Sequence, residues 1–293
     1  MTISTISVPR LNDQMWDFQR LHGIWQEAFS APHGNAIHFE FSRCDFLRPN
    51  AVVILGGLAR MLLRQGRTVM FLGNTMRPNV LANLTQNGFA HAMGASLTPW
   101  RGNAIPYKEF LEPNESLIVD SLRHDWLGRG WISVSEGLAD AIMGQVWELF
   151  TNAFEHSSSP IGVFSCGQHF PRHRQLLLTI ADFGVGIPSK VRSYLGYPCP
   201  TEEAMRRAFC RGFTTTDTPV PRGMGLDLVK DFVQKANGCL ELFSQDGYAR
   251  VDADGERYQN IGPIFAGTLV QIRLSCDDRF YLLSNELNQQ PFF

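Results

Sequence analysis

The sequence predicts an α/β protein made of two domains. The chain has 293 residues, and domains typically contain roughly 100 to 200 residues. Hydrophobic residues make up 44% and charged residues 18% of the chain, a balance typical of a folded globular protein. Strand-like and helix-like stretches alternate along it. We expect one domain over residues 1–130 and a second over 131–293.

Composition and charge exclude several classes of function. The longest apolar stretch, 51–63, is interrupted by Arg60 and is shorter than the roughly 20 residues that cross a bilayer. We therefore expect no membrane span. The net charge of −2 does not indicate a nucleic-acid partner. The N-terminus lacks the basic and apolar segments of a secretory signal, so we expect a cytoplasmic protein.

In the first half, apolar spacing predicts a β-α-β unit. We expect helices over 12–30, 50–66 and 77–88, and strands over 36–42 and 67–73. Prolines and glycines over 99–114 indicate an irregular connection. The apolar run 115–122 is interpreted as another strand. The segment 127–130, Leu-Gly-Arg-Gly, is the expected domain boundary.

The second half begins with a long helical pattern over 133–157, for which Ser135 is a candidate cap. Two β-rich runs follow at 161–167 and 175–184. A short helix at 202–209, a helix over 224–238 and closing strands at 238–244 and 267–274 complete the expected elements.

Three polar motifs in this half are candidates for a shared site. The first is a stripe on the long helix: Glu148, Asn152 and either Glu155 or His156 recur at spacings of three and four, which places them on one face. A carboxylate, an amide and a further polar group in line suit a metal ion and its water. A solvated helix face is the alternative.

The second motif is Asp182 with Gly184 and Gly186, where a strand ends in an acid and glycines let the backbone approach a ligand. An ordinary turn is the alternative. The third is Arg222-Gly223-Met-Gly225 before a helix. Its backbone N–H groups would lie at the positive end of the helix dipole, where phosphate binds.

Together these motifs resemble the Bergerat-fold ATPases of the GHKL superfamily over residues 134–275. They occur in the order helix, strand and turn, loop and helix, with 34 residues from Glu148 to Asp182 and 41 from Asp182 to Gly223. The resemblance implies an α/β sandwich with a mixed sheet and helices on one face. It also implies ATP and Mg²⁺ as cofactors.

The resemblance implies a role for each matched residue of the first two motifs. Glu148 matches the general base that activates water, and Asn152 matches the asparagine that ligates Mg²⁺. Asp182 matches the carboxylate that accepts a hydrogen bond from the adenine amino group. Gly184 and Gly186 would let the base pack against the loop.

The resemblance also implies a phosphate-binding set. Gly223 and Gly225 match a glycine box around the phosphates, with its helix anchored by Leu226 and Val229, and Lys230 is a further candidate phosphate contact. The remaining candidates are the hydroxyls of Thr214 and Thr215 and the charge of Arg222.

The first half resembles STAS domains, the anti-anti-sigma modules of bacterial partner switching, over residues 35–95. In those modules a GHKL kinase phosphorylates a serine at the start of the first helix. The equivalent stretch here, 46–51, has no hydroxyl, which argues against a working phospho-switch. A generic α/β sensor domain is the alternative.

The expected function is Mg²⁺-dependent ATP hydrolysis in a regulatory or signalling switch. We expect a protein partner, and a homodimer is compatible with this type of site. One alternative is a serine protein kinase of the anti-sigma type. The other is a module that binds ATP or ADP without hydrolysis and changes shape.

Overall fold

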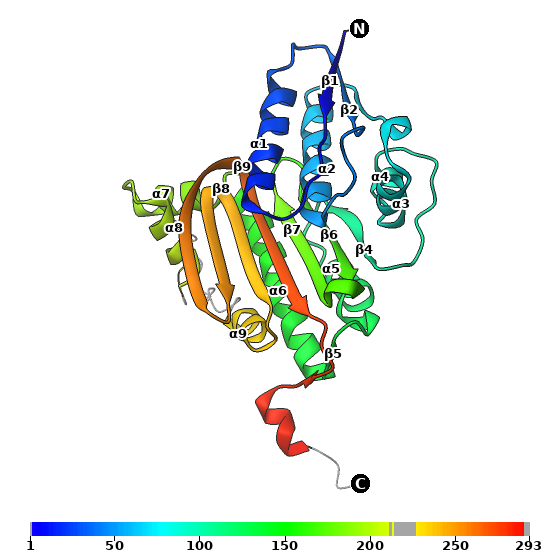
Figure 1. Cartoon of the computed structure of the whole chain (residues 1–293). Coiled ribbons are helices and arrows are strands. Elements are labelled where there is room, and N and C mark those ends of the chain that lie inside the picture. The colour runs from blue at the N-terminus through cyan, green and yellow to red at the C-terminus, as the bar shows by residue number, and fades with distance from the viewer. Residues whose placement is uncertain (1, 211–212, 214–226, 290–293) are drawn as a thin grey trace.

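The structure is a computed structural model, and it describes residues 2–210, 213 and 227–289. Two sheets form its framework (Figure 1). A three-stranded parallel sheet belongs to the first half, and a five-stranded sheet with the order β4-β6-β7-β9-β8 belongs mostly to the second. None of the helices in the described ranges is long and apolar enough to span a membrane.

The first half contains two successive β-α-β units. Strands β1, β2 and β3 pair in parallel, with α1 and α2 as the connecting helices. The elements are β1 (Ile3–Ser7), α1 (Met15–Ser30), β2 (Ala36–Glu40), α2 (Pro49–Arg64), β3 (Val69–Phe71), α3 (Pro78–Gln86) and α4 (Phe89–Ala92). The three predicted helices and two predicted strands are confirmed, and β1 is an additional strand.

Local sequence explains where α2 begins and ends. Pro49 occupies the first turn of α2, where its fixed φ suits the helix and its missing N–H is not needed. Just past the end, Gly66 has a φ of +74°, a left-handed conformation that glycine adopts without steric cost. Between them, residues 50–59 and Leu62 are buried.

The second half forms an α/β sandwich, which confirms the predicted fold class. Its elements are α6 (Glu136–Ser157), β6 (Val163–Phe170), β7 (Gln175–Asp182), α7 (Ile187–Leu195), α8 (Thr201–Ala208), α9 (Asp227–Lys235), β8 (Cys239–Asp252) and β9 (Gly255–Ser275). The pairs in the five-stranded sheet are antiparallel, where a mixed sheet was expected. Short connections join β6 to β7 and β8 to β9, and such connections favour antiparallel pairing.

Two predictions for the middle of the chain are wrong. Residues 115–122 form the start of a helix, α5 (Glu115–Asp125), and not a strand. The side chain of Asn114 caps this helix by accepting from the Leu117 N–H at 3.0 Å, and the buried Ile118 and Leu122 are spaced one turn apart. A short apolar run alone does not distinguish strand from helix.

The connection 99–114 is also not irregular throughout, because Ala104–Phe110 forms the edge strand β4. It pairs with β6, and the register shifts between Ile105 and Lys108. The shift spans Pro106, which has no N–H to donate and is tolerated at edges and bulges. The sheet of the second half therefore includes a strand that precedes residue 130. The division at 130/131 itself stays a prediction.

The five-stranded sheet is covered on both faces. Helices α6 and α9 pack on one face, with α5 beside them, and α1 and α2 pack on the other (Figure 1). Alternation along β7 shows this directly: Leu176, Leu178 and Ile180 belong to the α6 core, whereas Ala181 belongs to the α1 and α2 core. Because both faces are buried, β7 is apolar almost throughout.

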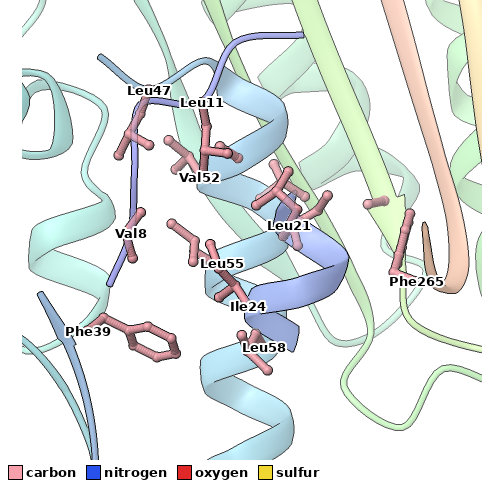
Figure 2. Close-up of a cluster of buried hydrophobic side chains, with 14 of the residues drawn as sticks. Val8, Leu11, Leu21, Ile24, Phe39, Leu47, Val52, Leu55, Leu58 and Phe265 are labelled. Atoms are coloured by element: carbon pink, nitrogen blue, oxygen red, sulfur yellow. The ribbon is translucent and has the colours of Figure 1, made fainter. Parts of the chain in front are cut away.

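The core around α1 and α2 connects the two sheets. Figure 2 shows Leu21 and Ile24 of α1 facing Leu55 and Leu58 of α2, with Val8 from the segment after β1 nearby. The remaining short elements lie at the lower end of the molecule or in connections: β5 (Ser133–Val134), β10 (Phe280–Tyr281) and 3-10 turns at Gly73–Thr75, Leu127–Arg129, Pro171–His173 and Ser284–Gln289.

Candidate functional site

The polar stripe predicted on the long helix lies on α6. Ser135 caps this helix by accepting from the Leu138 N–H at 3.1 Å, as predicted. The neighbouring face, which includes Leu138, Ile142, Val146 and Leu149, is buried in the core. Asn152 is exposed and Glu148 is partly buried. The helix therefore presents the candidate base and the candidate metal ligand one turn apart.

Asp182 is the last residue of β7, and its side chain lies on the α6 side of the sheet. It has the same parity as Leu178 and Ile180, which pack against the α6 core. Only 3% of Asp182 is exposed. Burial raises the pKa of Asp182 to about 7, and the bonds that it accepts from the Gly184 and Thr268 N–H groups and from Ser157 oppose this rise.

The turn after Asp182 packs against the end of α6. A β-carbon at Gly184 would overlap the carbonyl group of Ser157, the last residue of α6. The next N–H, of Val185, donates to that same carbonyl at 2.7 Å. Only glycine permits this approach. The contact joins the strand end that carries Asp182 to the helix that carries Asn152, as the predicted shared site requires.

Gly186 has a different reason to be glycine. Its φ of +73° lies in the left-handed region, where side chains are strained. It precedes α7, whose first N–H, of Ile187, donates to the Ser244 hydroxyl at 2.8 Å. The Ser189 N–H donates to the Gln245 side chain at 3.0 Å. Gly186 thus turns the chain from β7 into a helix anchored on β8.

Lys230, predicted as a phosphate contact, is 9% exposed in α9. Its Nζ donates to Glu256 Oε1 at 2.8 Å and to the Phe209 carbonyl at 3.2 Å, and it lies 4.9 Å from the centre of the Phe209 ring. The ammonium therefore connects α9 to β9 and to the end of α8. A contact with phosphate stays a prediction.

The other phosphate-binding candidates, Thr214, Thr215, Arg222, Gly223, Gly225 and Leu226, lie outside the described residues. Within the described ranges, no group of three or more His, Cys, Asp or Glu side chains could hold a metal ion.

Two residues with contacts at this site were not predicted from the sequence. Gln145 lies three residues before Glu148, and its Oε1 accepts from the Val229 N–H of α9 at 2.7 Å. Phe183 follows Asp182 and is buried among aromatic rings on the opposite face of the sheet. Helical spacing could have indicated Gln145. No local pattern indicates the partners of Phe183.

No curated protein matches the chain. Residues 137–276 match the family described as histidine kinase-, DNA gyrase B-, and HSP90-like ATPase. The match contains α6, the β6 to β9 strands, and the segments that carry Glu148, Asn152 and Asp182. The resemblance of the first half to STAS domains has no support from this match. Over residues 137–276, the chain is therefore similar to ATPase domains of the GHKL type.

Proposed function

We propose that the chain is a Mg²⁺-dependent ATPase that acts as a regulatory switch, with its nucleotide site between the end of β7 and the exposed stripe of α6. One observation carries the proposal: the family match at 137–276 includes a buried aspartate whose turn packs directly on α6. A carboxylate withdrawn from water at a strand end suits an amino group that donates a hydrogen bond to it, as adenine does.

Each candidate residue has a distinct task in this proposal. The carboxylate of Asp182 accepts from the adenine amino group and selects adenine. Glu148 orients and deprotonates the attacking water, and its position four residues before Asn152 places it on the same stripe. The close approach of Gly184 to Ser157 and the left-handed turn at Gly186 shape the loop against which the base packs.

The residues present fit a magnesium ion that is shared with the nucleotide. Asn152 offers one exposed amide oxygen, a hard ligand of the kind Mg²⁺ takes, and Mg²⁺ is usually bound through one or two protein ligands plus phosphates and water. When bound, the ion would offset negative charge on the phosphates.

The first half has a sensory or partner-binding role in this proposal, as a STAS-like domain over 1–130. The parallel pairing of β2 and β3 through α2 supports an α/β module there. The lack of a hydroxyl over 46–51 favours a role without phosphorylation in cis. We also propose a cytoplasmic location, a protein partner and dimerisation coupled to the nucleotide.

Phosphate release from ATP, measured with the pure full-length protein, tests the proposed reaction. Glu148→Ala is expected to abolish turnover and to leave ATP binding intact, because the base acts on water and not on the nucleotide. Glu136→Ala is the matched control: Glu136 is an exposed acid in the first turn of the same helix, and its loss is expected to leave turnover unchanged.

The same assay with γ-labelled ATP separates the alternatives. Free labelled phosphate supports hydrolysis, whereas label on the chain or on an added protein partner supports a kinase. Tight ATP binding without turnover in the wild type supports a non-hydrolysing module. Undiminished hydrolysis by Glu148→Ala would remove Glu148 as the base.

A further inference from the structure

A side chain of α6 holds the beginning of α9. The N–H of Val229, in the first turn of α9, donates to Gln145 Oε1 at 2.7 Å. Because Gln145 belongs to a different helix, this bond fixes the two helices relative to each other.

Apolar packing alone leaves that relationship less defined. Val229, Phe232 and Val233 of α9 are buried in the same core as Met143 and Val146 of α6. Hydrophobic contact is not directional, and it sets mainly the separation of the helices. A hydrogen bond has a preferred angle and length. The bond from the Val229 N–H therefore also sets the position of α9 along the axis of α6.

The side chain that sets this position belongs to the same stripe of α6 as the candidate catalytic residues. Gln145, Glu148 and Asn152 follow one another on α6 at spacings of three and four residues. At 1.5 Å per residue, Gln145 precedes Glu148 by about 4.5 Å and Asn152 by about 10.5 Å along the helix axis. The residue that accepts from the Val229 N–H therefore lies about one helical turn before Glu148 on α6.

We propose that Gln145 is a positioning residue for the nucleotide site. It fixes the first turn of α9, whose positive dipole end favours phosphate, relative to Glu148 and Asn152. The inference rests on the proposed function. It adds Gln145 as a residue that contacts neither the nucleotide nor the metal ion. Gln145 sets the distance between α9 and the α6 side chains that contact them.

The test compares two glutamines that hold the same helix. Gln145→Met removes the acceptor and keeps the length of the side chain. Gln234→Met is the matched control, because Gln234 Nε2 donates to the Asp252 carbonyl at 3.1 Å and anchors α9 nearer its other end. Calorimetry gives the Kd of each full-length variant for ATP with Mg²⁺, and thermal melting gives its stability.

Gln145→Met is expected to weaken ATP binding about fivefold to thirtyfold, which corresponds to about 1 to 2 kcal/mol, and Gln234→Met less than about twofold. Both variants are expected to melt at similar temperatures, because each loses one hydrogen bond of similar worth. Gln145→Ala also removes the acceptor, with a shorter side chain. It tests the same bond if the methionine variant does not fold, and it is expected to weaken ATP binding by at least as much.

ATP affinities within about twofold of the Gln234→Met value for both Gln145 variants would overturn the inference. Equal weakening by Gln145→Met and Gln234→Met would also overturn it, because the effect would then come from α9 stability. A wild type that binds no ATP would instead refute the proposed function.

Discussion

The two faces of the five-stranded sheet differ in what they bury. The face under α1 and α2 is closed by aromatic rings, with Phe18 stacked on Phe243 at 3.7 Å and Trp25 stacked on Phe183 at 5.6 Å between ring centres. The face under α6 and α9 carries the candidate polar groups at its end. Asp182 and Phe183 are neighbours in the chain, and their side chains lie on opposite faces of the sheet. One strand end therefore supports both the candidate site and the packing of the first half.

The largest expected effect is that of Phe183→Ala on stability. Phe183 is 3% exposed and contacts Trp25, Phe164 and Phe265, so its removal leaves a cavity between the halves. We expect a loss of about 3 to 5 kcal/mol in the free energy of unfolding, measured by urea denaturation. Phe280→Ala, at a side chain that is 62% exposed, is the control. A loss below about 1 kcal/mol at Phe183 would show that this ring does not hold the faces together.

Gly57→Ala is expected to act next most strongly, because a β-carbon at Gly57 of α2 would overlap the Phe183 ring. The added methyl group should destabilise the fold by about 1 to 3 kcal/mol. The same change at Gly144 of α6, where a β-carbon meets no atom within 4 Å, should stabilise it by up to about 1 kcal/mol. Thermal denaturation of the two variants measures the contrast, and equal shifts in Tm would contradict the close packing at Gly57.

Asp13→Asn tests the ionic contact at the border of the α1 face. Asp13 Oδ2 lies 2.8 Å from Arg273 Nη2, and the aspartate side chain is 7% exposed. Removing the charge should cost about 1 to 2 kcal/mol, since a hydrogen bond between charged groups is weakened. Asp140→Asn breaks the exposed pair of Asp140 with Arg123 and should cost about 0.5 kcal/mol or less. Equal losses in urea denaturation would contradict the distinction.

The smallest expected effect is the pH dependence of stability that arises from Asp182, on the α6 face of the sheet. Burial raises the pKa of Asp182 to about 7, whereas an unfolded aspartate titrates near about 3.9. The folded state therefore binds more protons than the unfolded state between these values, so Asp182 lowers stability as the pH rises through this window and adds no further change above it.

Asp182→Asn removes this titration. Relative to the wild type, its free energy of unfolding should rise by about 0.8 kcal/mol from pH 6.5 to pH 8. Urea denaturation of both proteins at the two pH values measures the difference, and comparison of the pair cancels the titration of other groups. A constant or falling difference would contradict the raised pKa.

Local signals in the sequence predict much of this fold. Spacing and end signals predict α2 and α6, and a β-rich run predicts β7. The strand β4 is not predicted because Pro106 and the neighbouring turn residues resemble a loop, and α5 is not because Ile118 and Val119 are β-branched. Contacts with residues that are distant in the sequence, and not local signals, determine β4 and α5.

The candidate site also has a part that local motifs predict and a part that they do not. Asp182 and the α6 stripe are predicted because each is a local motif. The bond between Gln145 and Val229 joins residues that are 84 positions apart, and the stacking of Trp25 on Phe183 joins the two halves. No periodicity within either segment carries information about such contacts.

Titration of the wild-type protein with ATP and Mg²⁺ in a calorimeter at pH 8, beside Asp182→Asn, tests the central claim most directly. At this pH the carboxylate is mostly ionised. We predict saturable binding to the wild type, and binding to the variant that is weaker by up to about 3 kcal/mol, the scale of one hydrogen bond to a charged group. No heat with the wild type would contradict the nucleotide site, and equal affinities would remove Asp182 from it.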